Sequence, residues 1–122
     1  ALRGMLAPVI SHLVEPRQME VIRVVVAEVK RSPELADAFY RAGPGRGAGP
    51  LERRLATEIE HGRLRLTDPE AATDMLFGMA IGAVHMFLLL GLRGPPDGSE
   101  VERLVAEAVE TFLRGALVAP QG

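Results

Sequence analysis

The chain contains no cysteine, and this absence excludes several kinds of site. Without a thiol it can form no disulfide, no thiolate metal site and no cysteine nucleophile, a usage that fits the reducing cytoplasm. A large net charge is missing too, because 14 basic and 16 acidic side chains leave a formal charge of −2. With no overall cationic field to hold a phosphate backbone, these 122 residues are not expected to bind nucleic acid themselves.

Motifs for cofactors, metals and catalysis are also missing. The glycines of residues 43–49 match neither the GxGxxG nor the P-loop pattern and follow no predicted strand. The histidines His12, His61 and His85 lie far apart, with no HxxxH or HExxH spacing, so we predict no metal site. Glutamates two residues apart point in different directions on a helix and give no acid–base pair. The sequence therefore predicts no enzyme activity and no cofactor.

What is present is the composition of one ordinary globular domain. Hydrophobic residues make up 48% of the chain and charged residues 25%, which excludes a disordered or fibrous chain. A chain of this length buries roughly two thirds of the surface that its unfolded form exposes, which suffices for one core. We therefore expect a single domain over residues 1–122.

The spacing of apolar residues predicts helices and no convincing pair of strands. Apolar positions three and four residues apart draw one stripe along each of the first two segments. Ser32-Pro33-Glu34 and Asp68-Pro69-Glu70 are helix start signals, in which the first side chain caps free N–H groups and proline occupies the first turn. The predicted helices cover residues 1–14, 16–31, 33–42, 51–61, 68–92 and 99–117. The predicted fold class is all-α, a bundle of about six helices.

Glycine and proline mark the breaks between these helices. The segment Gly43–Pro50 is rich in both residues and predicts a loop. Gly62 is suited to end the preceding helix in the left-handed conformation, and residues 63–66 alternate as an extended connector would. Ser99 with Glu102 forms a capping box that opens the last helix.

The most informative feature is an apolar run from Met75 to Leu92, in which His85 is the only polar side chain. Eighteen residues span about 27 Å as a helix, slightly less than a membrane core of about 30 Å. The other predicted helices all have polar faces, as in a soluble bundle. We therefore favour a core helix over a membrane span.

This run has two apolar sides, so it must be covered twice. One side holds Met75, Met79, Gly82, Met86 and Leu90, and the other holds Phe77, Ile81, Val84 and Leu88. Gly78 and Gly82 would let a second helix approach closely. The simplest cover for the second side is another copy of the chain, since a two-fold dimer buries the same patch on both subunits. The pattern leaves open which side meets the partner.

Three segments resemble the tetracycline-repressor (TetR) family of bacterial transcription regulators. They are VAEVKRSPELADAFYRAGP at residues 26–44, GRLRLTDPEAA at 62–72 and AVETFLRG at 108–115. The resemblance implies an all-helical effector-binding domain of a repressor that dimerises through its last two long helices, here about 68–92 and 99–117. It also implies an N-terminal helix-turn-helix head, which has no counterpart in these residues. We therefore expect DNA binding only through that domain of a longer parent protein.

In this family a small molecule enters between helices of the C-terminal domain and changes the spacing of the DNA-binding heads. The residues predicted to line the pocket are the inward positions of five helices: Met5, Val9, Ile22, Val26, Phe39, Leu55, Ile59, Met75 and Met79. Methionine adapts to different guests, so we expect a small hydrophobic or amphipathic effector. For any single one of these residues, ordinary core is the favoured interpretation, because every helical bundle needs such spacing.

The predicted homodimer interface lies on the last two helices. Its residues are Phe77, Gly78, Ile81, Gly82, Val84, His85, Leu88, Val101, Leu104, Val105, Ala108 and Phe112. His85 could offer a hydrogen bond to a ligand or be a neutral, internally satisfied side chain. The hydroxyl group of Tyr40 could reach the pocket or lie exposed beside the glycine-rich segment.

The leading hypothesis is thus the ligand-sensing, dimerising domain of a cytoplasmic TetR-type regulator. The alternative is a stand-alone dimeric helical scaffold that binds no ligand. A membrane-associated helical protein is the third possibility.

Overall fold

Six helices make up the regular structure of residues 2–42, 49–116 and 118, which the computed structural model describes. They are α1 (Leu2–Leu13), α2 (Pro16–Glu28), α3 (Pro33–Ala42), α5 (Gly49–Glu60), α6 (Pro69–Leu89) and α7 (Gly98–Ala116). The predicted all-α class is confirmed, and each predicted helix has its counterpart in this order.

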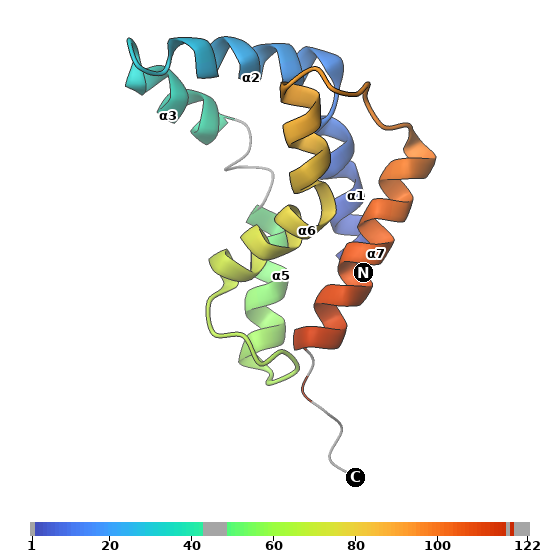
Figure 1. The fold of residues 1–122 in the computed structure, drawn as a ribbon. Coiled ribbons are helices and arrows are strands. Elements are labelled where there is room, and N and C mark those ends of the chain that lie inside the picture. The colour runs from blue at the N-terminus through green and yellow to red at the C-terminus, as the bar shows by residue number, and fades with distance from the viewer. Residues whose placement is uncertain (1, 43–48, 117, 119–122) are drawn as a thin grey trace.

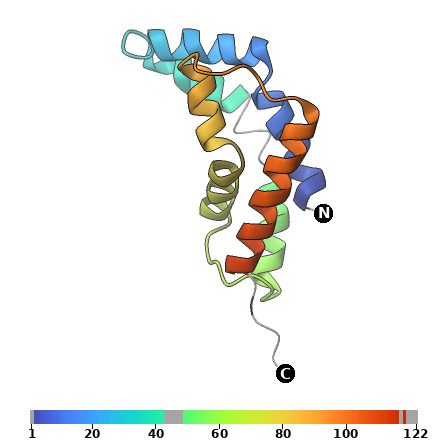
Figure 2. The ribbon, with the colours of Figure 1, turned by 45° about the vertical axis from the view of Figure 1, so that its right-hand side comes forward.

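Helix α6 occupies the centre of the arrangement (Figure 1). It packs against α5 and α7, and α7 also packs along α1, as both views show (Figure 2). The largest fully buried side chains include Leu6, Leu55, Leu76 and Val105, one from each of α1, α5, α6 and α7. These four helices therefore share one core, while α2 and α3 form a pair that crosses one end of it (Figure 1).

The start of α6 follows the predicted signal. The Oδ1 atom of Asp68 accepts hydrogen bonds from the backbone N–H groups of Glu70 at 3.0 Å and Ala71 at 3.3 Å. Pro69 occupies the first helical turn, where its missing N–H costs nothing. The predicted cap at Asp68 is confirmed.

The start of α7 differs from the predicted capping box at Ser99. The helix begins one residue earlier, at Gly98, and Asp97 Oδ1 accepts the backbone N–H of Glu100 at 2.8 Å. Asp97 lies three residues before that N–H group, the spacing at which a capping side chain reaches. Ser99 is already inside the helix, so it cannot take that place.

Two glycines in the left-handed conformation end α5 and α6. Gly62 has φ +74° and Gly91 has φ +72°, values that cost a residue with a Cβ atom. The N–H of Arg63 donates to the carbonyl of Glu58 at 3.0 Å, so the helix end at Gly62 is as predicted. Gly91 ends α6 before the predicted boundary at Leu92.

The predicted connector at residues 63–66 forms hydrogen bonds with the last residue of α7 and with Val118 beyond it. The N–H of Arg65 donates to the carbonyl of Ala116 at 2.8 Å, and the N–H of Val118 donates to the carbonyl of Arg63 at 3.3 Å. The predicted loop Gly43–Pro50 is shorter at its end, because α5 begins at Gly49. Residues 43–48 of that loop, and Leu117 of the last predicted helix, lie outside the described residues.

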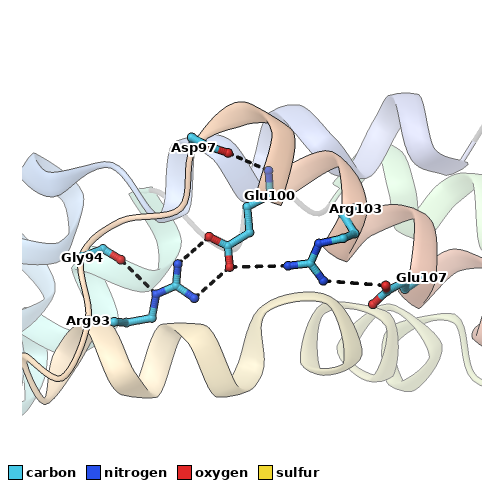
Figure 3. Close-up of polar contacts among 6 residues, drawn as sticks. All are labelled: Arg93, Gly94, Asp97, Glu100, Arg103 and Glu107. Carbon is cyan, nitrogen blue, oxygen red and sulfur yellow. Dashed lines mark hydrogen bonds and ion pairs between the residues drawn. The ribbon is translucent and has the colours of Figure 1, made fainter.

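The turn between α6 and α7 is held by a network of charged groups (Figure 3). The guanidinium of Arg93 binds both carboxylate oxygens of Glu100, with one N···O distance of 2.9 Å, and its Nε donates to the carbonyl of Gly94 at 3.0 Å. Arg103 lies 3.8 Å from the carboxylate of Glu100 and extends the network to Glu107, 3.7 Å away. The hydrogen bonds with Arg93 lower the pKa of Glu100, so its carboxylate stays ionised to lower pH.

Within the described residues, α6 is the one helix whose length and apolar composition would suit a membrane crossing, with a mean hydropathy of 1.6. In this chain 39% of the most apolar 18-residue stretch of α6 is buried inside the fold. A core helix meets the same criterion, so the apolar run alone does not indicate a membrane segment.

Candidate functional site

A groove of about 420 Å³ lies between α6 and the first three helices. Its apolar walls come from Val9 and Leu13 of α1, Ile22 of α2, Phe39 of α3, and Phe77 and Ile81 of α6. The volume and the largely apolar lining, with few polar groups, are those of a site for a small molecule.

Three polar side chains also line the groove. Tyr40 comes from α3, whereas Asp74 and His85 come from α6 and lie three turns of helix apart. Burial lowers the pKa of His85 below its ordinary value of 6.5, because desolvation penalises the charged form. His85 is therefore neutral at pH 7, where it can both donate and accept a hydrogen bond.

Two glycines keep the α6 side of the groove open. A Cβ atom added at Gly78 or at Gly82 would meet nothing within 4 Å. Glycine inside a helix costs about 1 kcal/mol relative to alanine, so their presence in the middle of α6 is not explained by helix formation. Both positions leave space along α6 in the isolated chain.

The structure brings together three of the nine residues predicted to line a pocket, namely Val9, Ile22 and Phe39. Leu55 is fully buried in the core, and Met5 and Ile59 pack against that core. The remaining three are exposed: Val26 on α2, and Met75 and Met79 on α6. The pocket assignment of these residues stays a prediction.

Eight further residues line the groove that the pocket prediction did not include: Leu13, Tyr40, Asp74, Phe77, Gly78, Ile81, Gly82 and His85. The sequence held signals for some of them. Tyr40 follows Phe39 directly, His85 interrupts the apolar run, and Asp74 is the last charged residue before it. Gly78, Ile81 and Gly82 were instead predicted to lie in the homodimer interface. Periodicity shows that two faces of α6 are apolar, but it does not show which helix covers each face.

A neighbouring side of α6, next to the groove, is exposed and apolar. Met75, Met79, Met86 and Leu90 follow one another along this side and are between 46% and 62% exposed. We call these four residues the methionine stripe. Their exposure is unusual for large apolar side chains on the central helix of a core, and an exposed apolar patch of this kind marks an interaction surface.

Most residues predicted for the dimer interface are covered by this chain's own core. Seven are buried there: Ile81, Val84, Leu88, Val101, Val105, Ala108 and Phe112. Phe77 and Leu104 pack against that core, whereas Gly78 and Gly82 are exposed and His85 is partly buried. The division of α6 thus differs from the predicted one, because Ile81, Val84 and Leu88 are buried in this chain's own core, whereas the methionine stripe lies outside it.

A larger groove of about 530 Å³ lies between the ends of α1, α5 and α7. It is lined by charged side chains that pair with one another: Arg54 with Glu58 at 3.2 Å, and Arg114 with Glu110 at 2.6 Å. The side-chain hydrogen bonds from Arg63 lower the pKa of Glu58. Because all of its charged side chains except Arg3 have partners within the described residues, the smaller and more apolar groove is the better candidate for a ligand.

Comparison with known proteins gives one family and two solved structures. The family model for the AefR-like transcriptional repressor C-terminal domain matches residues 1–115. A TetR-family transcriptional regulator from Mesorhizobium loti has a similar fold, with a TM-score of 0.83 and 24% identity over 96% of this chain. The flavonoid-responsive regulator FrrA has a TM-score of 0.73 and 23% identity over 89% of this chain.

These matches cover only part of each solved protein. The chain spans 58% of the Mesorhizobium loti regulator and 56% of FrrA. No curated protein matches the chain. The two similar structures belong to transcription regulators and not to enzymes.

Proposed function

The chain belongs to the TetR family of transcription regulators as an AefR-like C-terminal domain, and we propose that it senses a small hydrophobic or amphipathic effector and forms a homodimer. Operator binding then belongs to a separate N-terminal domain of the whole regulator, which acts in the cytoplasm. The observation that carries this proposal is the groove beside α6, together with the exposed methionine stripe on the same helix.

The groove supports an effector with an aromatic or aliphatic body. Phe39, Phe77 and Tyr40 offer ring faces and edges, and Tyr40 and His85 offer hydrogen bonds that would orient a guest. FrrA is described as flavonoid-responsive, and a flat, largely apolar flavonoid is a guest of the kind that such walls accept. We include flavonoids among the candidate effectors for this reason.

The methionine stripe supports a second copy of the chain as the partner. A two-fold interface pairs one patch with itself, and an antiparallel α6 pair would cover all four stripe residues on both subunits. Gly82 lies at the edge of the stripe, and its missing side chain would let the two helices approach closely. Methionine packs well against irregular surfaces, which suits such a contact.

Both features lie on α6, and this arrangement suggests how a signal is transmitted. One side of α6 forms the groove and another carries the stripe, so an effector that changes the position of α6 changes the dimer. The effector drives this shift only as far as it binds one arrangement more tightly than the other. In the whole regulator the shift would change the spacing of the two DNA-binding domains.

Effector binding is tested by thermal unfolding with flavone, a neutral flat aromatic probe. We expect a rise of the melting temperature with flavone concentration, because a ligand that binds only the folded chain stabilises it. The matched variant Gly78→Leu places a side chain in the groove, where a Cβ atom meets nothing, and should remove the shift without unfolding the chain. A flavone shift of equal size in this variant would contradict the groove as the effector site.

Dimerisation is tested by light scattering of the Met79→Glu, Met86→Glu double variant. Two carboxylates per subunit in the middle of the stripe should convert the dimer to a folded monomer, because burying unpaired charges is costly. Val24→Glu, which changes an exposed valine on α2, should remain dimeric. A monomeric native chain, or a dimer that keeps its affinity in the double variant, would exclude the stripe as the interface.

A further inference from the structure

The effector groove carries one acidic side chain and no basic one among its described lining residues. Asp74, on the second turn of α6, is an exposed lining residue, and neither lysine nor arginine is among the described lining residues. Of the other two polar groups, Tyr40 contributes a hydroxyl group, and His85 is neutral at pH 7 because burial lowers its pKa. The described walls therefore carry one negative charge.

This carboxylate has no basic partner within the part of the chain that the structure describes. By contrast, Asp37 on α3 pairs with Arg41 at 3.1 Å, and Glu110 on α7 pairs with Arg114 at 2.6 Å. Among the described residues, no cation therefore competes with a guest for Asp74. A negative charge at the edge of an apolar groove attracts cations and repels anions more strongly than it would in open water.

The aromatic side chains of the groove also favour a positively charged guest. Phe39, Tyr40 and Phe77 all line it, and the face of an aromatic ring attracts a cation that lies within about 6 Å of the ring centre. An ammonium group can therefore contact Asp74 and a ring face while the rest of the molecule fills the apolar part.

We propose that the groove binds aromatic or lipophilic molecules that carry a positive charge more tightly than uncharged ones such as flavonoids, with Asp74 as the counter-ion of the ammonium group. This inference rests on the proposed effector site and names the chemical class of its ligand. Molecules of the same shape with a carboxylate in place of the ammonium group are disfavoured by repulsion from Asp74.

The experiment compares three probes of one shape: 2-(2-naphthyl)ethylamine, 2-(2-naphthyl)ethanol and 2-naphthylacetate. Their dissociation constants are measured with the native chain by calorimetry at pH 7 and low salt. We expect the ammonium probe to bind about tenfold more tightly than the carboxylate, because one contact is attractive and the other repulsive, with the alcohol between them. Added salt should narrow the gap through screening.

Three variants identify the cause of that preference. Asp74→Asn should give the ammonium and carboxylate probes similar affinities while leaving the alcohol unchanged, and Asp74→Glu should keep the preference. Val24→Glu adds a negative charge on α2, outside the groove, and should change none of the three affinities. Circular dichroism confirms that each variant has the native helix content.

The possible results separate the ligand class from the site. Equal affinities in the native chain, a tighter carboxylate, or an ammonium preference that survives Asp74→Asn would overturn the assignment of a cationic ligand and leave the effector groove standing. Probe binding that Gly78→Leu does not weaken, or no binding of any probe, would contradict the groove itself and with it the proposed effector site.

Discussion

Replacing Gly82 by alanine should affect the single chain and the dimer in opposite directions. In the isolated chain a Cβ atom at this position meets nothing within 4 Å, so the methyl group causes no clash. Alanine is favoured over glycine inside a helix by about 0.8–1.0 kcal/mol, and Gly82 lies well inside α6. For a domain of this length such a gain raises the melting temperature by about 4 °C.

The dimer should respond differently, because two-fold symmetry places two new methyl groups at the contact. Overpacking a close helix contact costs about 1–3 kcal/mol, so the dissociation constant of the dimer should rise by about 5- to 150-fold. Gly4→Ala is the control: its Cβ also meets nothing, but it lies on α1, away from the methionine stripe. It should leave dimerisation unchanged.

Two measurements check this reasoning. Sedimentation equilibrium gives the dissociation constants of the native chain and of both variants. Urea unfolding, at a concentration where the chain is monomeric, gives the free energy of unfolding. If the Gly82→Ala monomer is less stable than the native monomer, the conclusion that a methyl group fits at this position without a clash is wrong. An unchanged dimer affinity would refute a close helix contact at Gly82.

Three further changes follow from the core, a cap and the ion pairs. Leu76→Ala should lower the free energy of unfolding in urea by about 2–5 kcal/mol, since Leu76 is fully buried and leaves a cavity; a loss below about 1 kcal/mol would contradict its place in the core. Asp68→Ala should cost about 1 kcal/mol and lower the melting temperature, because two N–H groups of α6 lose their acceptor, whereas Asp68→Asn should keep most of the stability. The pKa values of Glu58 and Glu100 are lowered in the folded chain by hydrogen bonds from arginine, so their contribution to stability is present above pH 4.5 and is lost as the pH falls through the lowered values. The lowered pKa of His85 acts in the same direction below pH 6.5, since the unfolded chain there binds more protons. Melting temperatures should therefore fall with acidity between pH 7 and pH 3, and the Glu100→Gln variant should show a smaller fall.

Local sequence signals predicted most helix boundaries because they act over a single turn. Asp68 with Pro69 starts α6, and Gly62 ends α5, through contacts between residues that are neighbours in the chain. The start of α7 was wrong by one residue, since Asp97 and Ser99 both have side chains that can cap a helix. Only the folded turn, in which Asp97 reaches the N–H of Glu100, decides between them.

The groove was predicted only in part, for a reason that lies in the packing. Periodicity along α6 showed two apolar sides, but it carries no information about which neighbour covers each side. In the fold Val84 and Leu88 are buried in the core, whereas Met75 and Met79, which the sequence assigned to a pocket, lie on the outside.

The sequence by itself determined the all-α class, the order of the helices, and an apolar helix that needs cover on two sides, because all three follow from residue spacing along one chain. Tertiary structure alone decided that Val9, Ile22 and Phe39 line one groove together with Asp74, His85 and two glycines of α6. These residues come from four helices, and their distances depend on how those helices cross, which no local pattern encodes.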